Sequence, residues 1–273
     1  MIVRGAGPPL VLIPGVQGRW EWMRPAVEAL AASFTVATFS LIGERGTGCR
    51  LQREAAFDRH ADQVDEVLDR AGWQKAAICG VSYGGLVAVR YAALRPERTS
   101  TLVLVSAPGP RWRPNARVSR YVSSPWASLP AFVLGAPWRL WPEMRAAYPT
   151  LPKAFAGAAR HLLRVASAPA WPPRMARRLE IIRGHDFLED ARRVDVPTLV
   201  ITGEDHLDYV VPVEGTLEYA RVIPGAATRA LLRTGHLGIV TRPQAFCALV
   251  AGFVEECKVS AGPDDLRPMT ADR

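Results

Sequence analysis

The sequence contains little cysteine, with four in 273 residues and none in a C-x-x-C spacing. Such scattered cysteines argue against a disulfide framework and against a zinc site built on thiolates, so we predict no bound metal. Cys49, Cys247 and Cys257 share no structural pattern. Cys79 lies in a short apolar run and is expected to pack as a small hydrophobic residue.

Long apolar runs are absent as well. No stretch reaches the roughly 20 apolar residues that a membrane-spanning helix needs. Near the N-terminus the apolar run 10–13 meets Pro14 and Gly15 at once, and it is too short for the core of a signal peptide. We therefore predict a cytoplasmic protein without an integral membrane segment. With 49% hydrophobic residues, the chain can still bury a full core.

Lysine is scarce, and arginine carries almost the whole net charge of +8. Residues 111–193 hold 15 basic and 5 acidic side chains, a net +10, which leaves −2 for the rest of the chain. The plainest interpretation is a solvated basic face. The alternative is a docking face for acyl carrier protein, coenzyme A or anionic lipid. No nucleic-acid motif accompanies the arginines, so we predict no nucleic-acid partner.

A phosphate-binding loop is also missing. The glycine-rich loop 43–48 lacks the G-x-x-x-x-G-K-[ST] pattern and does not lead directly into a helix. Both features are needed for a loop whose backbone holds phosphate groups. We predict no bound nucleotide or dinucleotide.

What the sequence does contain is an alternation of short apolar runs and helical patterns. Such alternation predicts an α/β fold with a mostly parallel, doubly wound sheet. Strands are expected at residues 9–14, 34–39, 75–79, 101–106, 196–203 and 228–233, and helices at 20–32, 57–71, 86–94, 212–219 and 243–254.

The alternation stops between residues 108 and 194. This segment holds five of the eight tryptophans and no strong strand pattern, with helical pieces expected at 128–134, 142–147, 153–166 and 174–183. A disordered insertion would be poor in aromatic residues, so we predict a helical cap inserted into the core. The predicted domains are a core of residues 1–108 and 195–257, a cap of residues 109–194 and a flexible tail of residues 258–273.

A serine occupies the sharpest point of one predicted strand-to-helix turn. Residues 80–84 read GVSYG, and Ser82 stands between the strand and an alanine-rich helix. The glycines two positions before and after give the clearance that such a turn needs, as in a nucleophile elbow. The pattern is common by chance, so a matching acid and histidine decide its meaning.

The histidine is predicted to be His236, which directly follows the last predicted strand. An imidazole titrates in the range useful for taking a proton from a hydroxyl. The other histidines lie on a helix, in the cap or in other loops: His60, His161, His185 and His206.

The acid is expected in the loop after the strand that ends near Thr202. The strand ending at Ser106 leaves through a carboxylate-free segment, whereas Glu204, Asp205 and Asp208 all follow Thr202. An acid must orient the imidazole and stabilise its positive charge. We favour Asp208, which lies four residues before the proline that opens the next helix, and keep Asp205 as the alternative.

An oxyanion hole needs two convergent backbone N–H groups. One is predicted at Tyr83, directly after the serine. The second is expected in the loop after the first strand, where we favour Val16 with Gln17 as the alternative. The Gln17 side chain is also a predicted substrate contact.

These features together resemble the α/β-hydrolase superfamily, in particular its capped esterase, lipase and C–C hydrolase members. The resemblance rests on GVSYG at 80–84, on residues 208–212 and on TGH at 234–236, and it covers roughly residues 8–256. Two motifs differ from the family pattern. Pro14 stands where many members carry histidine, and the loop 43–48 lacks the aspartate of an Asp-x-x-Gly-x-Gly loop.

The resemblance implies a serine hydrolase that cleaves a carboxylic ester or a related small-molecule acyl substrate through an acyl-enzyme on Ser82, without metal or cofactor. An anionic or carrier-bound substrate would suit the basic cap. The alternatives are C–C bond, lactone or peptide hydrolysis on the same fold, and a non-catalytic hydrolase-like ligand receptor.

Overall fold

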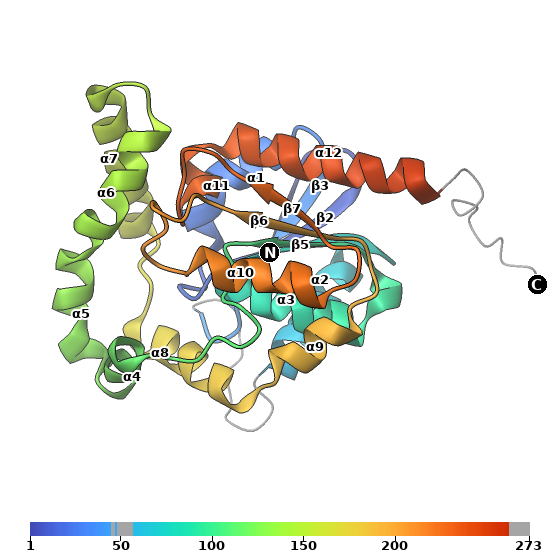
Figure 1. The fold of residues 1–273 in the computed structure, drawn as a ribbon, viewed down its shortest axis with the longest axis horizontal. Coiled ribbons are helices and arrows are strands. Elements are labelled where there is room, and N and C mark those ends of the chain that lie inside the picture. The colour runs from blue at the N-terminus through green and yellow to red at the C-terminus, as the bar shows by residue number, and fades with distance from the viewer. Residues whose placement is uncertain (45–46, 48–56, 262–273) are drawn as a thin grey trace, which may run out of the picture.

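The structure is a computed structural model that describes residues 1–44, 47 and 57–261. A central sheet is covered by helices on both faces, and further helices project at one end of the molecule (Figure 1). Residues 45, 46 and 48 of the glycine-rich loop 43–48, and with them Cys49, lie outside the described residues.

The described residues form one seven-stranded sheet in the order β1-β3-β2-β4-β5-β6-β7. Only β1 runs antiparallel to its neighbour, so the predicted fold class, a mostly parallel sheet, is confirmed. Strands β4 and β6 are buried along their whole length, as expected for parallel strands covered on both faces. The strands are β1 Ile2–Arg4, β2 Pro9–Ile13, β3 Thr35–Thr38, β4 Ala76–Val81, β5 Thr99–Val105, β6 Thr198–Thr202 and β7 Ala227–Ala230.

Two apolar clusters join the sheet to its helices. One contains Leu86 of α3 and Tyr219 of α10, and the other contains Val27 of α1 and Phe246 of α12. No helix in the described part of the chain is long and apolar enough to cross a membrane. The covering helices are α1 Arg24–Leu30, α2 Asp58–Ala71, α3 Tyr83–Leu94, α9 Phe187–Arg193, α10 Val213–Val222, α11 Gly238–Thr241 and α12 Pro243–Ala261.

The last helix corrects one expectation. A closing helix was expected to end near Val254 and a flexible tail to begin at residue 258, but α12 continues to Ala261. Glu255, Glu256 and Lys258 interrupt the apolar periodicity that sequence interpretation follows, while the backbone continues its own hydrogen bonding.

The segment between β5 and β6 is helical, as predicted. Its five projecting helices begin with one that was not predicted, at residues 116–123, where Asn115 caps the first turn by accepting from the Val118 N–H at 3.0 Å. The helices are α4 Ala116–Ser123, α5 Pro125–Leu134, α6 Ala136–Ala147, α7 Leu151–Ser167 and α8 Pro172–Ile181.

Helix α9 lies inside the predicted cap range but packs on the core. Phe187 and Ala191 are buried in the cluster that includes α3. Asp190 is buried and accepts a hydrogen bond from Arg90 of α3 at 2.8 Å. The helices that project from the core are therefore α4 to α8, and the boundary at residue 194 stays a prediction.

Candidate active site

Ser82 alone forms the turn between β4 and α3. Its backbone adopts φ 53° and ψ −121°, a conformation that L-residues rarely occupy and that persists only when the surroundings enforce it. The Ser82 N–H donates to the Val105 carbonyl at 2.8 Å, and the Ser82 carbonyl accepts from the Gly85 N–H at 2.8 Å. The side chain is only partly buried, so a substrate can reach its hydroxyl.

The glycines of the turn are required by the close approach of backbone to backbone. A Cβ atom on Gly80 would collide with the Gly84 carbonyl oxygen. A Cβ atom on Gly84 would collide with the carbonyl oxygen of Ile13 at the end of β2. The glycine spacing thus holds the serine turn against the exit of the neighbouring strand.

Asp208 and His236 come together from the loops after β6 and β7. His236 Nδ1 lies 3.3 Å from Asp208 Oδ2. The other carboxylate oxygen, Oδ1, accepts from the N–H groups of Val210 and Val211 at 3.0 and 2.9 Å. The carboxylate is buried. This arrangement fixes the carboxylate and directs Nε2 of the imidazole away from it.

The competing acids lie elsewhere. Asp205 is exposed, and Glu204 is engaged by the Arg233 N–H at 3.2 Å. The structure therefore brings Asp208, and neither Glu204 nor Asp205, to the histidine. The two loops are held against each other, because the Glu204 N–H donates to the Thr234 carbonyl at 2.8 Å.

Asp208 and His236 each stabilise the charged form of the other. Burial lowers the pKa of His236, but the charge of Asp208, its hydrogen bond and the charge of Glu143 outweigh burial and raise that pKa above its usual value. Burial raises the pKa of Asp208, but the His236 charge and the hydrogen bonds to the carboxylate lower it overall. A carboxylate held ionised beside an imidazole is what a general base requires.

The predicted oxyanion donors occupy suitable backbone positions. Tyr83 is the first residue of α3, so its N–H has no acceptor within the helix. Val16 lies in a turn closed by the Gly18 N–H and the Gly15 carbonyl at 2.9 Å, and among the described residues its own N–H has no acceptor. The partly buried Gln17 folds its side-chain oxygen over Gly15.

Two residues of the cap were missed by the sequence interpretation. The first is Glu143 of α6, which is buried and accepts from the Leu237 N–H at 2.8 Å and from the Thr241 hydroxyl at 3.3 Å. Burial raises the pKa of Glu143 to about 7. The carboxylate thus ties the cap to the residue directly after His236. Its one signal in the sequence is that it is the single acid between residues 116 and 167.

The second is Arg178 of α8, which is fully buried and donates to the carbonyls of Val16 at 3.0 Å and Ile42 at 3.1 Å. It also pairs with the buried Glu44 at 2.8 Å. Arg178 therefore connects the cap to the turn that carries the predicted oxyanion donor. No sequence signal distinguished it from the other arginines.

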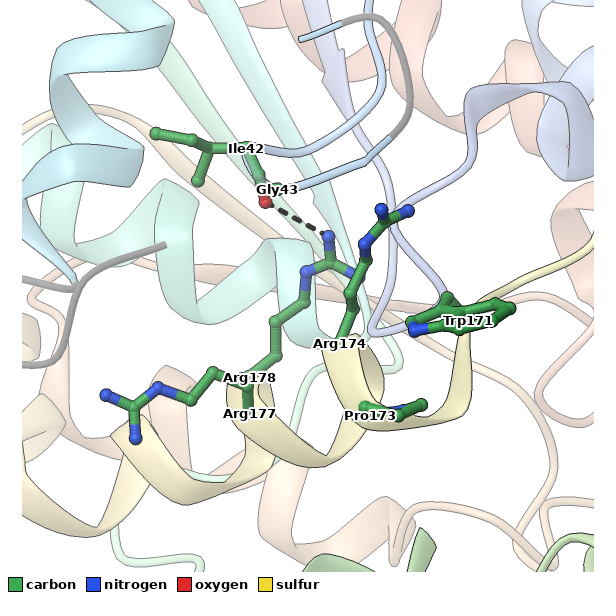
Figure 2. A pocket seen from close by; sticks show the side chains of 7 residues that line it. All are labelled: Ile42, Gly43, Trp171, Pro173, Arg174, Arg177 and Arg178. Carbon is green, nitrogen blue, oxygen red and sulfur yellow. Dashed lines mark hydrogen bonds between the residues drawn. The ribbon is translucent and has the colours of Figure 1, made fainter. Parts of the chain in front are cut away.

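A cavity of about 270 Å³ is lined in part by Arg178 (Figure 2). Arg174 also reaches Glu44, at 3.2 Å, so part of the positive charge on the wall is neutralised. Arg177 pairs with Glu180, so the three arginines of this helix exceed the two carboxylates that they contact by one positive charge, which favours an anionic group only weakly. Its lining residues are Ile42, Gly43, Trp171, Pro173, Arg174, Arg177 and Arg178.

The chain matches a family model and several curated proteins along most of its length. A family model described as alpha/beta hydrolase fold matches residues 8–243. The chain is 26% identical over 264 residues to "Putative carbamate hydrolase RutD" of Stutzerimonas stutzeri, covering 91% of this chain and 92% of that protein. It is 28% identical over 259 residues to the protein of the same name from Escherichia coli O127:H6, covering 89% and 90%.

Solved structures resemble the chain in fold. The enol-lactonase from Burkholderia xenovorans LB400 has a TM-score of 0.74 and 22% identity, over 93% of this chain and 95% of that one. An esterase from Exiguobacterium antarcticum has a TM-score of 0.75 and 18% identity, over 93% and 94%.

Proposed function

The chain belongs to the alpha/beta hydrolase fold family, and from this premise we propose that it is a serine hydrolase that cleaves a carboxylic ester or a related acyl substrate. The observation that carries the proposal is the Asp208–His236 pair, 3.3 Å apart, in loops that leave the same edge of the sheet as the strained Ser82 turn. A nucleophile, a base and an orienting acid are the parts that acyl transfer needs.

In the proposed reaction, the Ser82 hydroxyl attacks the carbonyl carbon while His236 Nε2 takes its proton. Asp208 holds the imidazole through Nδ1 and stabilises its positive charge. The N–H groups of Val16 and Tyr83 bind the oxyanion of the tetrahedral intermediate. His236 then gives the proton to the leaving group. In the second half of the reaction His236 takes a proton from water, whose oxygen attacks the acyl carbon, and returns that proton to the Ser82 oxygen as the acyl-enzyme bond breaks.

A carbamate is the second candidate substrate, since its carbonyl is attacked in the same way. The names of the curated relatives, which match about nine tenths of this chain, favour it. The arginines of the cavity beside α8 favour a substrate that carries an anionic group.

The proposal is tested by labelling the whole protein with a fluorophosphonate and mapping the modified peptide by mass spectrometry. We expect modification at Ser82, at a rate that falls at least about 100-fold in a His236→Ala variant, because only a base-activated hydroxyl reacts quickly. Hydrolysis of aryl esters of increasing chain length, aryl carbamates and lactones then ranks the acyl class. Absence of labelling together with absence of turnover would favour a ligand receptor and refute the enzyme proposal.

Replacing Glu143 by glutamine is expected to move the acid limb of the pH dependence of kcat/KM to lower pH. The charge of Glu143 contributes to the raised pKa of His236, and the base must be neutral to act, so losing that charge lets His236 act at lower pH. Glutamine retains an oxygen that can accept from the Leu237 N–H.

The matched control for Glu143→Gln is Glu189→Gln, because Glu189 is an exposed carboxylate on α9. Its profile should coincide with that of the wild type. An unmoved acid limb in Glu143→Gln would mean that this carboxylate does not act on His236.

A further inference from the structure

Helices α5, α6 and α7, called here the cap arm, stack at one end of the molecule away from the sheet (Figure 1). Their large apolar side chains are unusually exposed, with Trp138 at 88%, Leu134 at 79% and Leu163 at 70%. Single exposed apolar residues are ordinary, but a group of this size on helices that pack against one another is typical of a binding surface. The further exposed members are Trp126, Phe132, Val133, Leu151, Phe155 and Leu162.

The exposed side chains follow the helix periodicity rather than chance. On α7, Leu151, Phe155 and Leu162 recur at the spacing of one helix face, and all three are exposed. Ala154 and Gly157 lie on another face and are buried. Helix α5 has no charged residue and no buried residue. Helices α6 and α7 therefore bury one side in the protein, and all three helices of the arm present apolar side chains outward.

The cap arm is also basic. Between residues 125 and 167 five side chains are basic, and the single acid, Glu143, is buried. Arg145 lies seven residues after Trp138 and so shares its face of α6. Arg139 lies over the Phe132 ring, 5.4 Å from the ring centroid. A partner for this surface should be apolar and negatively charged.

We propose that the cap arm docks on an anionic lipid surface. The apolar side chains of α5 to α7 would enter the headgroup region, tryptophans would lie at the interface, and the arginines would reach the lipid phosphates. A second copy of the chain suits the surface less well. It would bring two sets of five cations together, and the arm offers no exposed carboxylate to pair with them.

Glu143 connects the cap arm to the proposed reaction centre. Glu143 belongs to the arm and contacts the loop of His236, so the docked surface and the proposed reaction centre share one helix. The docking proposal nevertheless stands on the surface alone and does not depend on hydrolysis.

The test is flotation of the full chain with vesicles of phosphatidylcholine alone or mixed with phosphatidylglycerol, at low and high salt. We expect binding to the anionic vesicles only, weakened by salt. An apolar variant (Leu134→Ser, Trp138→Ser, Leu163→Ser) should lose flotation. A charge variant (Arg139→Gln, Arg145→Gln) should bind about 25-fold more weakly, at roughly fivefold per arginine.

The matched control removes two exposed cations outside the arm, Lys75→Gln with Arg192→Gln, and should bind like the wild type. Circular dichroism and thermal unfolding check that each variant is folded. The proposal is overturned if the wild type does not float with anionic vesicles, or if the control weakens flotation as much as the charge variant. It is also overturned if sedimentation velocity finds a dimer that the apolar variant loses, without any vesicle binding.

Discussion

Replacing Ser82 by alanine is expected to lower kcat for an activated ester by about 10⁴- to 10⁶-fold, the range typical of removing a catalytic nucleophile. Without the hydroxyl no acyl-enzyme can form, and His236 has no proton to take. Alanine fits the same space and can occupy the same turn, so the structure of the loop should persist. Steady-state kinetics with a chromogenic short-chain ester measure the loss.

Ser106 provides the matched control, because it also has positive φ, 43°, and also follows a central strand. It is buried, and its N–H donates to the Ile201 carbonyl at 2.9 Å. Ser106→Ala should retain kcat within about threefold, because the change is small and the buried Ser106 side chain has no part in the proposed proton transfers. Near-normal turnover in Ser82→Ala would place the nucleophile elsewhere and refute the proposed mechanism.

The parts of the site that the sequence predicted are those fixed by local structure. Ser82, Asp208 and His236 each follow a strand of the sheet, and parallel strands deliver their exits to one edge. Strand exits are recognisable from apolar runs and turn residues without knowledge of long-range packing. The positions of these three residues in the fold could therefore be predicted from the strands that they follow and from their order along the chain.

The residues that the sequence did not predict act across long separations. Glu143 meets Leu237 at a distance of 94 residues along the chain, and Arg178 meets Val16 at 162. Helix periodicity indicates which side of a cap helix is apolar, but it does not indicate where that helix docks on the core. A lone acid in an otherwise basic or apolar stretch, such as Glu143, is the strongest sign of such a contact that a single sequence gives.

The outer strands β1 and β7 were predicted less well from the sequence than the central strands. A last strand was expected at 228–233, whereas β7 covers Ala227–Ala230 and is mostly exposed, and the short β1 was not expected. Edge strands are buried on fewer sides, so they lack the continuous apolar run that identifies the central strands.

Replacing Arg178 by methionine is expected to destabilise the protein by about 3 kcal/mol, because it leaves the buried carboxylate of Glu44 without its closest cation. The melting temperature should fall by roughly 5–10 °C. The carbonyl of Val16 also loses its donor, which loosens the turn that carries a proposed oxyanion N–H. We therefore expect kcat to fall about tenfold with little change in KM.

Arg174→Met is the matched control, since Arg174 belongs to the same helix and pairs with the same carboxylate but is 34% exposed. A solvated pair of this kind contributes at most about 1 kcal/mol, and Arg174 makes no described hydrogen bond to the Val16 turn. Removing both partners, in Glu44→Gln with Arg178→Met, should recover part of the stability but not of kcat, because the buried charge disappears while the Val16 carbonyl stays unpaired. If Arg178→Met proved no more damaging than Arg174→Met, the buried ion pair would not be what holds the oxyanion turn in place.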